Sequence, residues 1–283
     1  MNSKVWVYFL IVFAFTACKK PENANDSLRS DFEQLKPGKL TDAATKKTWP
    51  GAKLLCGKKD YIFYKTGITP HPHFIARENE NTFLKVKIPA HLFGPITGAQ
   101  WTIPLKLKDE YYLQYRIKFE KGFDFVKGGK LPGLAGGTAN TGGNIPDGYD
   151  GWSARMMFWE NGKLSYYLYF PEQSGKFGEK FFLSTNAVDT LKITTDKWHT
   201  ITQRVKMNTP GVANGIVQAW YDGEEAFFSD SVLFRHNRNL KIDQILYNVF
   251  LGGDDLSWSS DKEEYIYFDD FKASTNLKPE HAF

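Results

Sequence analysis

Short stretches in which apolar and polar residues alternate recur along the chain and predict β-strands. The clearest spans residues 111–119, where one predicted strand face is formed by Tyr111, Leu113, Tyr115, Ile117 and Phe119. Shorter apolar runs follow at residues 216–221, 245–251 and 265–271. No segment carries the long 3.6-residue stripe of an amphipathic helix. We therefore predict an all-β fold, a jelly-roll sandwich of two antiparallel sheets with a groove on its concave face.

The N-terminus resembles a secretory signal. Lys4 precedes an apolar run at residues 5–15, and the small residues Thr16 and Ala17 precede Cys18. The run is too short to span a bilayer. Cys18 occupies the position of the lipidated cysteine in a bacterial lipobox, so we predict a signal peptide over residues 1–17 and a lipid on Cys18. Ordinary signal cleavage with an incidental cysteine is the alternative.

Downstream of this signal, the composition changes once. Residues 18–42 are polar and are predicted to form a flexible tether, and residues 43–283 are predicted to form one domain. Lipidation would anchor a monomeric domain to the outer membrane or cell surface, with the periplasm as the alternative location. The other cysteine is Cys56, so a lipidated Cys18 leaves no internal disulfide.

Composition and charge narrow the class of ligand. Aromatic residues make up 16% of the chain, with 24 glycines and 13 prolines, which suits short strands with aromatic side chains left over for a binding surface. The formal charge of +4 comes with no basic stripe, so no nucleic-acid partner is expected. A polyanionic ligand is compatible with this charge but not required by it.

Four polar side chains fall on a predicted hairpin at residues 151–169. Ser153 and Arg155 share one face of its first strand, and Tyr167 and Tyr169 share one face of its second. The length of the connecting loop decides whether those two faces coincide.

Two loops are possible at this hairpin. A two-residue loop at Asn161 and Gly162 would pair Arg155 with Leu168 and separate the polar side chains. A three-residue loop at residues 160–162, with Gly162 in the left-handed conformation, pairs Arg155 with Tyr167, and Ser153 with Tyr169. We predict the second register.

A guanidinium, a hydroxyl and two phenols on one surface suit β-elimination from a uronate. A cation neutralises the C6 carboxylate so that the C5 proton becomes removable. Tyrosine can be the base, the acid or both, but its usual pKa is about 10, so nearby cations are needed to lower it. Besides Arg155, Lys130 would supply such a cation from residues 127–134, which are predicted to form a rigid glycine loop.

Several stretches together resemble polysaccharide lyase family 14, the group of alginate lyases and glucuronan-lyase-like enzymes. The resemblance runs in matching order over roughly residues 100–275 and rests on residues 115–119, 122–130, 152–155, 167–169, 203–205, 220–223 and 267–271. It implies a β-jelly roll with a substrate cleft. It supports a uronate lyase better than any one substrate, with alginate as the first choice and glucuronan as the second, and the predicted reaction requires no cofactor. The residues that it places in the cleft as catalytic are Lys130, Ser153, Arg155, Tyr167 and Tyr169.

Other candidates remain open at this stage. Gln114, Arg116 and Lys118 either line the same groove or form a solvent-exposed face. Gln203 and Trp220 lie within matching stretches and are expected to contact substrate, although Trp101, Trp220 and Trp258 would equally fill a core.

Metal and histidine sites have less support. His71 and His73 have the spacing of a metal pair but no evident third ligand, and His199 is either a second base or a core histidine. No metal is required by the predicted chemistry. A structural calcium at Asp254 and Asp255, or at Asp269 and Asp270, remains an alternative to turn and strand-end roles.

Two competing functions use a similar fold. A glycoside hydrolase needs two carboxylates flanking the scissile bond, and the predicted polar face carries none. A surface lipoprotein that only binds glycan would use the same aromatic and basic groove, so the sequence discriminates poorly against it.

Overall fold

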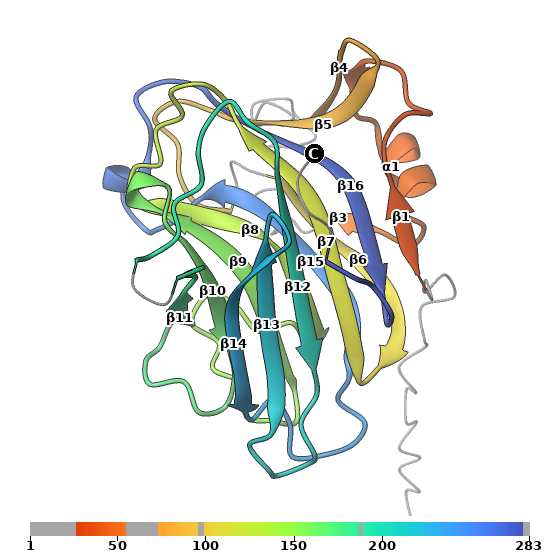
Figure 1. The fold of residues 1–283 in the computed structure, drawn as a ribbon, viewed down its shortest axis with the longest axis vertical. Helices are drawn as coiled ribbons and strands as arrows, with labels where there is room; N and C mark the ends of the chain where they lie inside the picture. The colour runs from red at the N-terminus through yellow and green to blue at the C-terminus, as the bar shows by residue number, and fades with distance from the viewer. Residues whose placement is uncertain (1–26, 55–72, 96–98, 187–188, 280–283) are drawn as a thin grey trace, which may run out of the picture.

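The computed structural model describes residues 27–54, 73–95, 99–186 and 189–279. These residues form two antiparallel sheets packed face to face as a jelly-roll sandwich (Figure 1). The nine-stranded sheet contains, in spatial order, β14 (Glu224–Val232), β13 (Gly215–Tyr221), β12 (His199–Lys206), β7 (Glu110–Phe119), β16 (Glu264–Ser274), β5 (Asn81–Ile88), β4 (His73–Glu78) and β2 (Gly38–Lys39), with β1 (Leu28–Ser30) also paired to β16.

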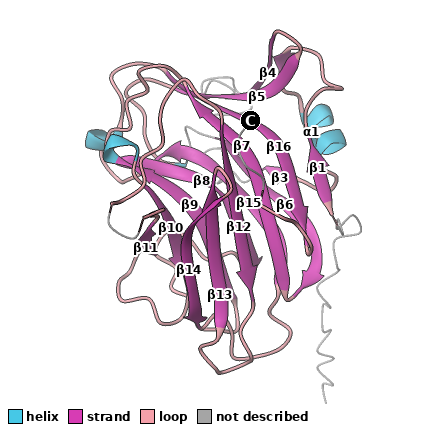
Figure 2. Ribbon diagram, viewed as in Figure 1, coloured by secondary structure: helices cyan, strands magenta, loops and turns pink. Residues whose placement is uncertain are grey.

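The second sheet packs behind the first in the view of Figure 1. It has seven strands in the order β11 (Glu179–Phe182), β10 (Leu164–Tyr169), β9 (Gly151–Trp159), β8 (Gly128–Gly137), β15 (Ile242–Leu251), β6 (Ala99–Lys108) and β3 (Lys53–Leu54). The helical elements named among the described residues are α1 (Asp42–Thr48) and two short 3-10 turns, so strands dominate (Figure 2). The predicted all-β class is confirmed.

The core between the two sheets consists of apolar side chains from alternate residues of the strands. The apolar residues predicted to share one face of β7 are all fully buried, from Tyr111 to Phe119. Opposite them, β9 and β10 turn their own apolar residues inward, including Trp152, Met156 and Tyr166. The odd-numbered residues of β9 and β10 therefore point away from the nine-stranded sheet, onto the outer face of the seven-stranded sheet.

The N-terminal boundary differs from the expectation. Residues 28–42 were expected to belong to a flexible tether, but β1 pairs with β16 and β2 pairs with β4. Leu28, Phe32 and Leu40 are buried in the core, and the Phe32 ring lies 5.8 Å from that of Trp49. Apolar side chains spaced among polar ones anchor this segment, so the tether does not extend to residue 42.

Parts of the N-terminal interpretation fall outside the described residues. These parts are residues 1–17 with the predicted signal, Cys18 with its predicted lipid, and Cys56. Within the described ranges, no helix is long and apolar enough to cross a membrane.

The stretch around Lys130 is a strand and not a loop. Residues 128–137 form β8, which pairs with β9 and with β15. Its glycines permit close approach: a Cβ on Gly129 would lie 2.3 Å from the Phe158 ring, and one on Gly133 would lie 2.1 Å from the Ala154 carbonyl oxygen. The expected close approach is present, but in a buried central strand.

Candidate functional site

The hairpin between β9 and β10 adopts the predicted register. Arg155 lies opposite Tyr167, and Ser153 lies opposite Tyr169. Three residues, Glu160–Gly162, form the connection, and the Trp159 N–H donates to the Lys163 carbonyl across it at 2.8 Å. Gly162 has the expected left-handed conformation, at φ 74°, so a three-residue loop sets the cluster on one face.

A β-bulge brings Lys130 to the same face. Lys130 pairs with Met157, but Gly133 pairs with Arg155, so β8 contains one more residue than β9 between these two pairs. The extra residue lies in the stretch that includes Pro132, which has no N–H to donate to a ladder. The bulge thus sets a lysine beside the hairpin cluster.

Arg155 is almost fully enclosed. Its side chain is 3% exposed, and Nη1 donates a hydrogen bond of 2.9 Å to Oδ1 of Asn248 on β15. Its guanidinium carbon lies 5.8 Å from the Tyr167 ring centre and 5.9 Å from that of Tyr169. Nε has no hydrogen-bond partner. Burial lowers the pKa of Arg155 to about 10, and the two phenols act in the opposite direction, so the group stays charged at neutral pH.

Lys130 is the second cation of the cluster. Its ammonium lies 3.6 Å from the centre of the Tyr167 ring and 2.8 Å from the Met157 sulfur. Burial, followed by the charge of Arg155, holds the pKa of Lys130 well below its usual value. No Asp or Glu of the described ranges offsets that shift.

The two phenols differ in exposure. Tyr167 is 9% exposed and Tyr169 only 1%, and their rings meet edge to face with centres 5.7 Å apart. Burial and the neighbouring Tyr169 raise the pKa of Tyr167, and Arg155 lowers it by less. The expectation that cations would lower the pKa of both phenols is therefore wrong for Tyr167, because desolvation outweighs the nearby charge.

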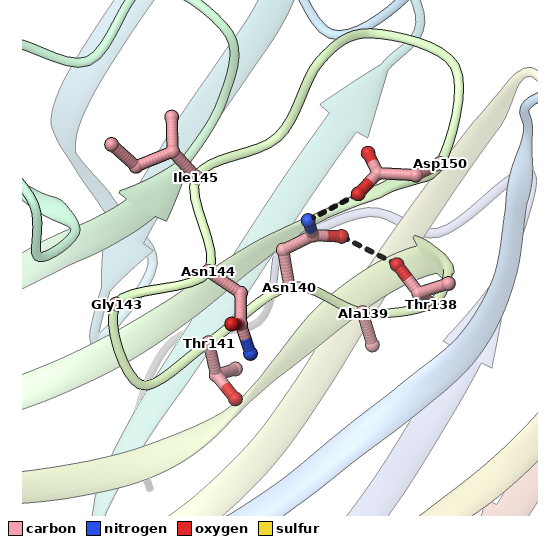
Figure 3. Close-up of a pocket in the computed structure, with 8 residues that line it drawn as sticks. All are labelled: Thr138, Ala139, Asn140, Thr141, Gly143, Asn144, Ile145 and Asp150. Carbon is pink, nitrogen blue, oxygen red and sulfur yellow. Dashed lines mark hydrogen bonds between the residues drawn. The ribbon is translucent and has the colours of Figure 1, made fainter.

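Ser153 is fully buried beneath a loop. Its Oγ donates a 2.7 Å hydrogen bond to the Asn140 carbonyl oxygen, in the connection from β8 to β9 at residues 138–150. The same connection borders a cavity of about 630 Å³ (Figure 3). The residues that line it are Thr138, Ala139, Asn140, Thr141, Gly143, Asn144, Ile145 and Asp150.

The five predicted substrate contacts lie elsewhere. Gln114, Arg116 and Lys118 occupy the outer face of the nine-stranded sheet, because their odd-numbered neighbours on β7 fill the core. Gln203 is fully buried between the sheets, where Nε2 donates to the Pro132 carbonyl oxygen at 2.8 Å. Trp220 stacks on Tyr112, which is also an even-numbered residue of β7.

These positions separate the two sets of predicted residues. The predicted catalytic set lies on one outer surface of the sandwich, and the predicted contacts on β7 lie on the opposite one. A single groove does not join them. Of the three tryptophans left open above, Trp101 is in the core, Trp220 is on the nine-stranded face, and Trp258 packs beside Met157 and the two phenols.

Several side chains at the site were missed. Asn248, 3% exposed, binds Arg155 and also donates from Nδ2 to Gln100 at 3.3 Å. It is the one amide in the apolar run at residues 245–251, which is the signal that would have identified it. Along β9, Trp159 extends the same face, with the Lys180 ammonium 4.9 Å from its ring centre.

The two histidine candidates that the structure describes are buried and contact neighbouring side chains. His71 lies outside the described residues, and His73 is buried against Trp101 with ring centres 4.2 Å apart. His199 is 4% exposed and contacts Thr194 and Asp222, each at 2.8 Å.

The acidic pairs take part in local structure. Asp255 caps a 3-10 turn by accepting from the Ser257 N–H at 2.8 Å. Asp269 is buried beside Asp270, and burial raises its pKa to about 7. Across the described ranges, no group of three or more His, Cys, Asp or Glu residues is arranged to hold a metal ion.

Comparisons with known proteins identify a family and a shared fold. A family model described as polysaccharide lyase 14 matches residues 76–271. The structure of alginate lyase Aly36B aligns with a TM-score of 0.76 and 22% identity, over 91% of this chain and 100% of that chain. An Aly36B mutant in complex with an alginate tetrasaccharide aligns with a TM-score of 0.75 and 21% identity, over 91% of this chain and 100% of that chain.

A third structure has the same fold. The PL-14 alginate lyase from Aplysia kurodai aligns with a TM-score of 0.71 and 20% identity, over 88% of this chain and 98% of that chain. No curated protein matches this sequence. At these identities the solved structures establish a shared fold, and the family model matches well over half of the chain.

Proposed function

The chain belongs to the polysaccharide lyase 14 family, and from that premise we propose that it cleaves a uronate-containing acidic polysaccharide by β-elimination, with alginate as its substrate before glucuronan. The reaction takes place on the outer face of the seven-stranded sheet. The observation that carries this proposal is the pair of cations, Arg155 and Lys130, which lie beside two phenols and form no ion pair with a carboxylate of the described residues. Among the described residues, no Asp or Glu is a cause of the pKa shift of either cation.

Arg155 has the geometry to bind the C6 carboxylate. Nη1 is fixed by Asn248, and Nε is without a partner, so the guanidinium is oriented with a donor to spare. A carboxylate supplied by the substrate would satisfy that donor and neutralise a buried charge. Neutralising the carboxylate stabilises the enolate-like charge that develops when the C5 proton leaves.

The phenols move the proton. One phenolate takes the C5 proton, the electron pair forms the C4–C5 double bond, and the C4–O4 bond breaks. A phenol then gives a proton to O4 of the departing chain. Atoms and charge balance without a cofactor, and the products are one chain with a new reducing end and one chain whose new non-reducing end is the unsaturated uronate. Tyr167 is the more exposed phenol and is placed to meet the sugar.

The products distinguish this function from its alternatives. We would incubate the protein with alginate blocks, glucuronan and a neutral glucan, and follow ultraviolet absorbance and reducing ends in parallel. A lyase yields both signals from a uronate polymer, a hydrolase yields reducing ends only, and a glycan-binding protein yields neither. Arg155→Ala should remove both signals while binding no polymer at the site. Reducing ends without absorbance would contradict β-elimination.

We also propose that the mature protein is a lipoprotein of the outer membrane or cell surface, attached through Cys18. Support comes from the sequence alone, namely Lys4, the apolar run at residues 5–15, and the small residues before Cys18. The full chain, expressed in a bacterium and partitioned with detergent, should enter the detergent phase and incorporate labelled fatty acid. Cys18→Ala should do neither, and equal labelling of both would contradict a lipid on Cys18.

A further inference from the structure

We propose that Lys180, on the edge strand β11, binds the carboxylate of a second uronate in the substrate, while Trp159 and Phe182 form the surface on which that sugar lies. The inference rests on the proposed lyase function and extends it, because it assigns a binding site beyond the sugar that is cleaved. The three residues take no part in the chemical step. They make long uronate chains better substrates than short ones.

Lys180 lies in line with the proposed catalytic cluster. The strands β8, β9, β10 and β11 are consecutive in the seven-stranded sheet (Figure 1). Arg155 pairs with Tyr167, and Tyr167 pairs with Lys180. Residues that lie directly opposite each other on neighbouring strands share a face. Two strand spacings, roughly 10 Å, separate the backbones of Arg155 and Lys180, so the two cations are placed to meet different sugars of one chain.

Alternation along β11 turns Lys180 and Phe182 outward. Phe181, which lies between them, packs against the core of the sandwich. Its two neighbours therefore lie on the outer face. Phe182 is 39% exposed, and the Lys180 side chain is exposed as well. Both are accessible to a glycan that lies on the outer face of the seven-stranded sheet.

Trp159 connects this edge to the phenol that meets the sugar. Its indole N–H donates to Oγ of Ser165 at 2.8 Å, which orients the ring. The ring centre lies 6.5 Å from that of Tyr167 and 6.1 Å from that of Phe182. Aromatic rings therefore extend from Tyr167 to the edge of the sheet. Such rings offer a large apolar surface against which the apolar side of a sugar can pack.

The Lys180 ammonium keeps its charge available for an anion. It lies 4.9 Å from the ring centre of Trp159 and 5.8 Å from that of Phe182. Aromatic faces attract a cation without neutralising it. Within the described ranges, Lys180 forms no ion pair with a carboxylate. The carboxylate of a uronate can therefore bind an ammonium that the rings already hold in place.

The other side of the phenol pair is covered. Tyr169 is 1% exposed, and its oxygen accepts from the Gly143 N–H at 3.3 Å, in the connection at residues 138–150. Gly178 lies against the same ring, because a Cβ there would come within 2.6 Å of it. A sugar chain that passes Tyr167 therefore finds open surface toward Lys180 and not toward Tyr169.

The first experiment compares Lys180→Ala with wild type on alginate oligosaccharides from trisaccharide to hexasaccharide. On the hexasaccharide we expect KM to increase about twofold to fivefold, the scale of an exposed ion pair, with kcat changed less than about twofold. The ratio of the two KM values should be smallest for the trisaccharide and increase with length. An equal ratio at every length, or a fall in kcat with KM unmoved, would overturn the proposal.

A charge series at Lys180 tests the carboxylate. Lys180→Arg keeps the charge and should retain the wild-type KM on the hexasaccharide. Lys180→Glu should increase KM more than Lys180→Ala does, and added salt should reduce the difference, because exposed charges are screened. A wild-type KM in Lys180→Glu would refute an ion pair between Lys180 and the substrate.

Phe182 tests the aromatic surface separately from the charge. Phe182→Ala removes an exposed ring and should raise KM on the hexasaccharide about twofold to tenfold, the scale of an aromatic contact. Phe182→Tyr retains a ring of the same shape and should keep the wild-type KM. Equal KM values in Phe182→Ala and wild type would show that no sugar lies on this ring.

A matched lysine on the opposite face serves as the control. Lys85 lies 3.9 Å from the ring centre of Tyr265 and 5.9 Å from that of Tyr267, so it too is held over two aromatic rings. It is paired with Tyr267, in line with Lys118 on the outer face of the nine-stranded sheet. Lys85→Ala should leave KM unchanged at every length. An increase equal to that in Lys180→Ala would show that net charge, and not a site on β11, is responsible.

Binding without turnover distinguishes failure of this proposal from failure of the lyase function. Titration calorimetry with the hexasaccharide would compare Tyr167→Phe with the double variant that also carries Lys180→Ala. The double variant should bind about twofold to fivefold more weakly. An unchanged Kd, with unsaturated products released by wild type, would refute the Lys180 site alone. A weakened Kd, with no such products from wild type, would support the site and refute β-elimination alone.

Discussion

The two outer faces of the sandwich carry similar residues in different electrostatic settings. On the nine-stranded face, Lys118 lies 5.3 Å from the Trp198 ring centre but also bonds Glu78 at 3.0 Å, and Arg116 lies 3.5 Å from Asp270. On the seven-stranded face, Lys130 and Arg155 also lie against aromatic rings, but their polar partners are neutral.

The difference shows what makes a cation available for an anionic substrate. A cation that is paired with a carboxylate offers little to a second anion, and pairs of this exposed kind contribute little to stability. A buried cation bound to an amide or a thioether keeps its charge uncompensated, which is costly until an anion arrives. Aromatic and basic residues alone therefore do not identify the substrate face.

Removing the arginine from each face in turn should give the largest difference in kcat/KM between the two faces. Arg155→Ala should lower kcat/KM on alginate by about 10³-fold or more, because the developing negative charge loses its buried counter-charge. Arg116→Ala, on the opposite face, should change it less than about twofold. Both values would be measured at one ionic strength. Comparable losses in the two variants would show that both faces serve catalysis.

A single added carboxylate should make the active face resemble the other one. Asn248→Asp places an acid where Oδ1 of Asn248 now lies, 2.9 Å from the Arg155 guanidinium. The internal pair would compete with substrate, and we expect kcat/KM to fall about tenfold to a hundredfold. Asn248→Ala removes the same amide without adding charge and should lose less. Equal losses would indicate that orientation, and not charge, is the function of Asn248.

The charge on Lys130 predicts a pH effect on binding. Because burial and the neighbouring Arg155 hold its pKa well below the usual value, wild-type Lys130 loses its charge at a lower pH than an exposed lysine, and KM should increase as it does. Lys130→Arg keeps the charge and should show a flatter KM profile over the same range. A loss of activity in Lys130→Arg at all pH values would instead indicate that neutral Lys130 acts as the base.

The smallest effect concerns stability. Because its pKa is lowered, Lys130 binds a proton more weakly in the folded protein than in the unfolded chain. Protonation therefore favours the unfolded chain, and Lys130 destabilises the fold below the usual lysine pKa of about 10.4. Lys130→Met should raise the free energy of unfolding by about 1 kcal/mol at neutral pH, a gain that disappears above that pKa. Chemical denaturation at both pH values would measure it.

The other face supplies the comparison for that stability change. Lys118→Met removes a paired, partly exposed cation, and we expect a loss of about 0.5 kcal/mol or less at neutral pH. A stabilisation by Lys118→Met equal to that by Lys130→Met would show that the uncompensated charge of Lys130 is not the cause.

Local patterns in the sequence were sufficient for the fold class and for one critical register. Alternation along residues 111–119 predicted which side chains of β7 are buried, and Gly162 selected the loop that aligns Arg155 with Tyr167. Both features depend on near neighbours in the chain. The strand at residues 128–137 was mistaken for a loop because glycines there serve close packing against Phe158, a contact that the sequence does not display.

The rest of the site depends on contacts between distant segments. Asn248 reaches Arg155 from β15, and Gly143 reaches Tyr169 from the preceding loop, so spacing along the chain could not reveal either. Alternation placed Gln114 and Arg116 on one side of β7, but it could not show that this side faces away from the catalytic cluster. Which face carries uncompensated charge is a property of the assembled sandwich.

The most direct test of the central claim uses alginate and the same polymer with its C6 carboxylates reduced to alcohols. Cleavage is followed as new reducing ends, which either polymer would release. An uncompensated Arg155 that works by neutralising a carboxylate predicts new reducing ends from alginate and none from the reduced polymer. New reducing ends at comparable rates from both polymers would contradict the account.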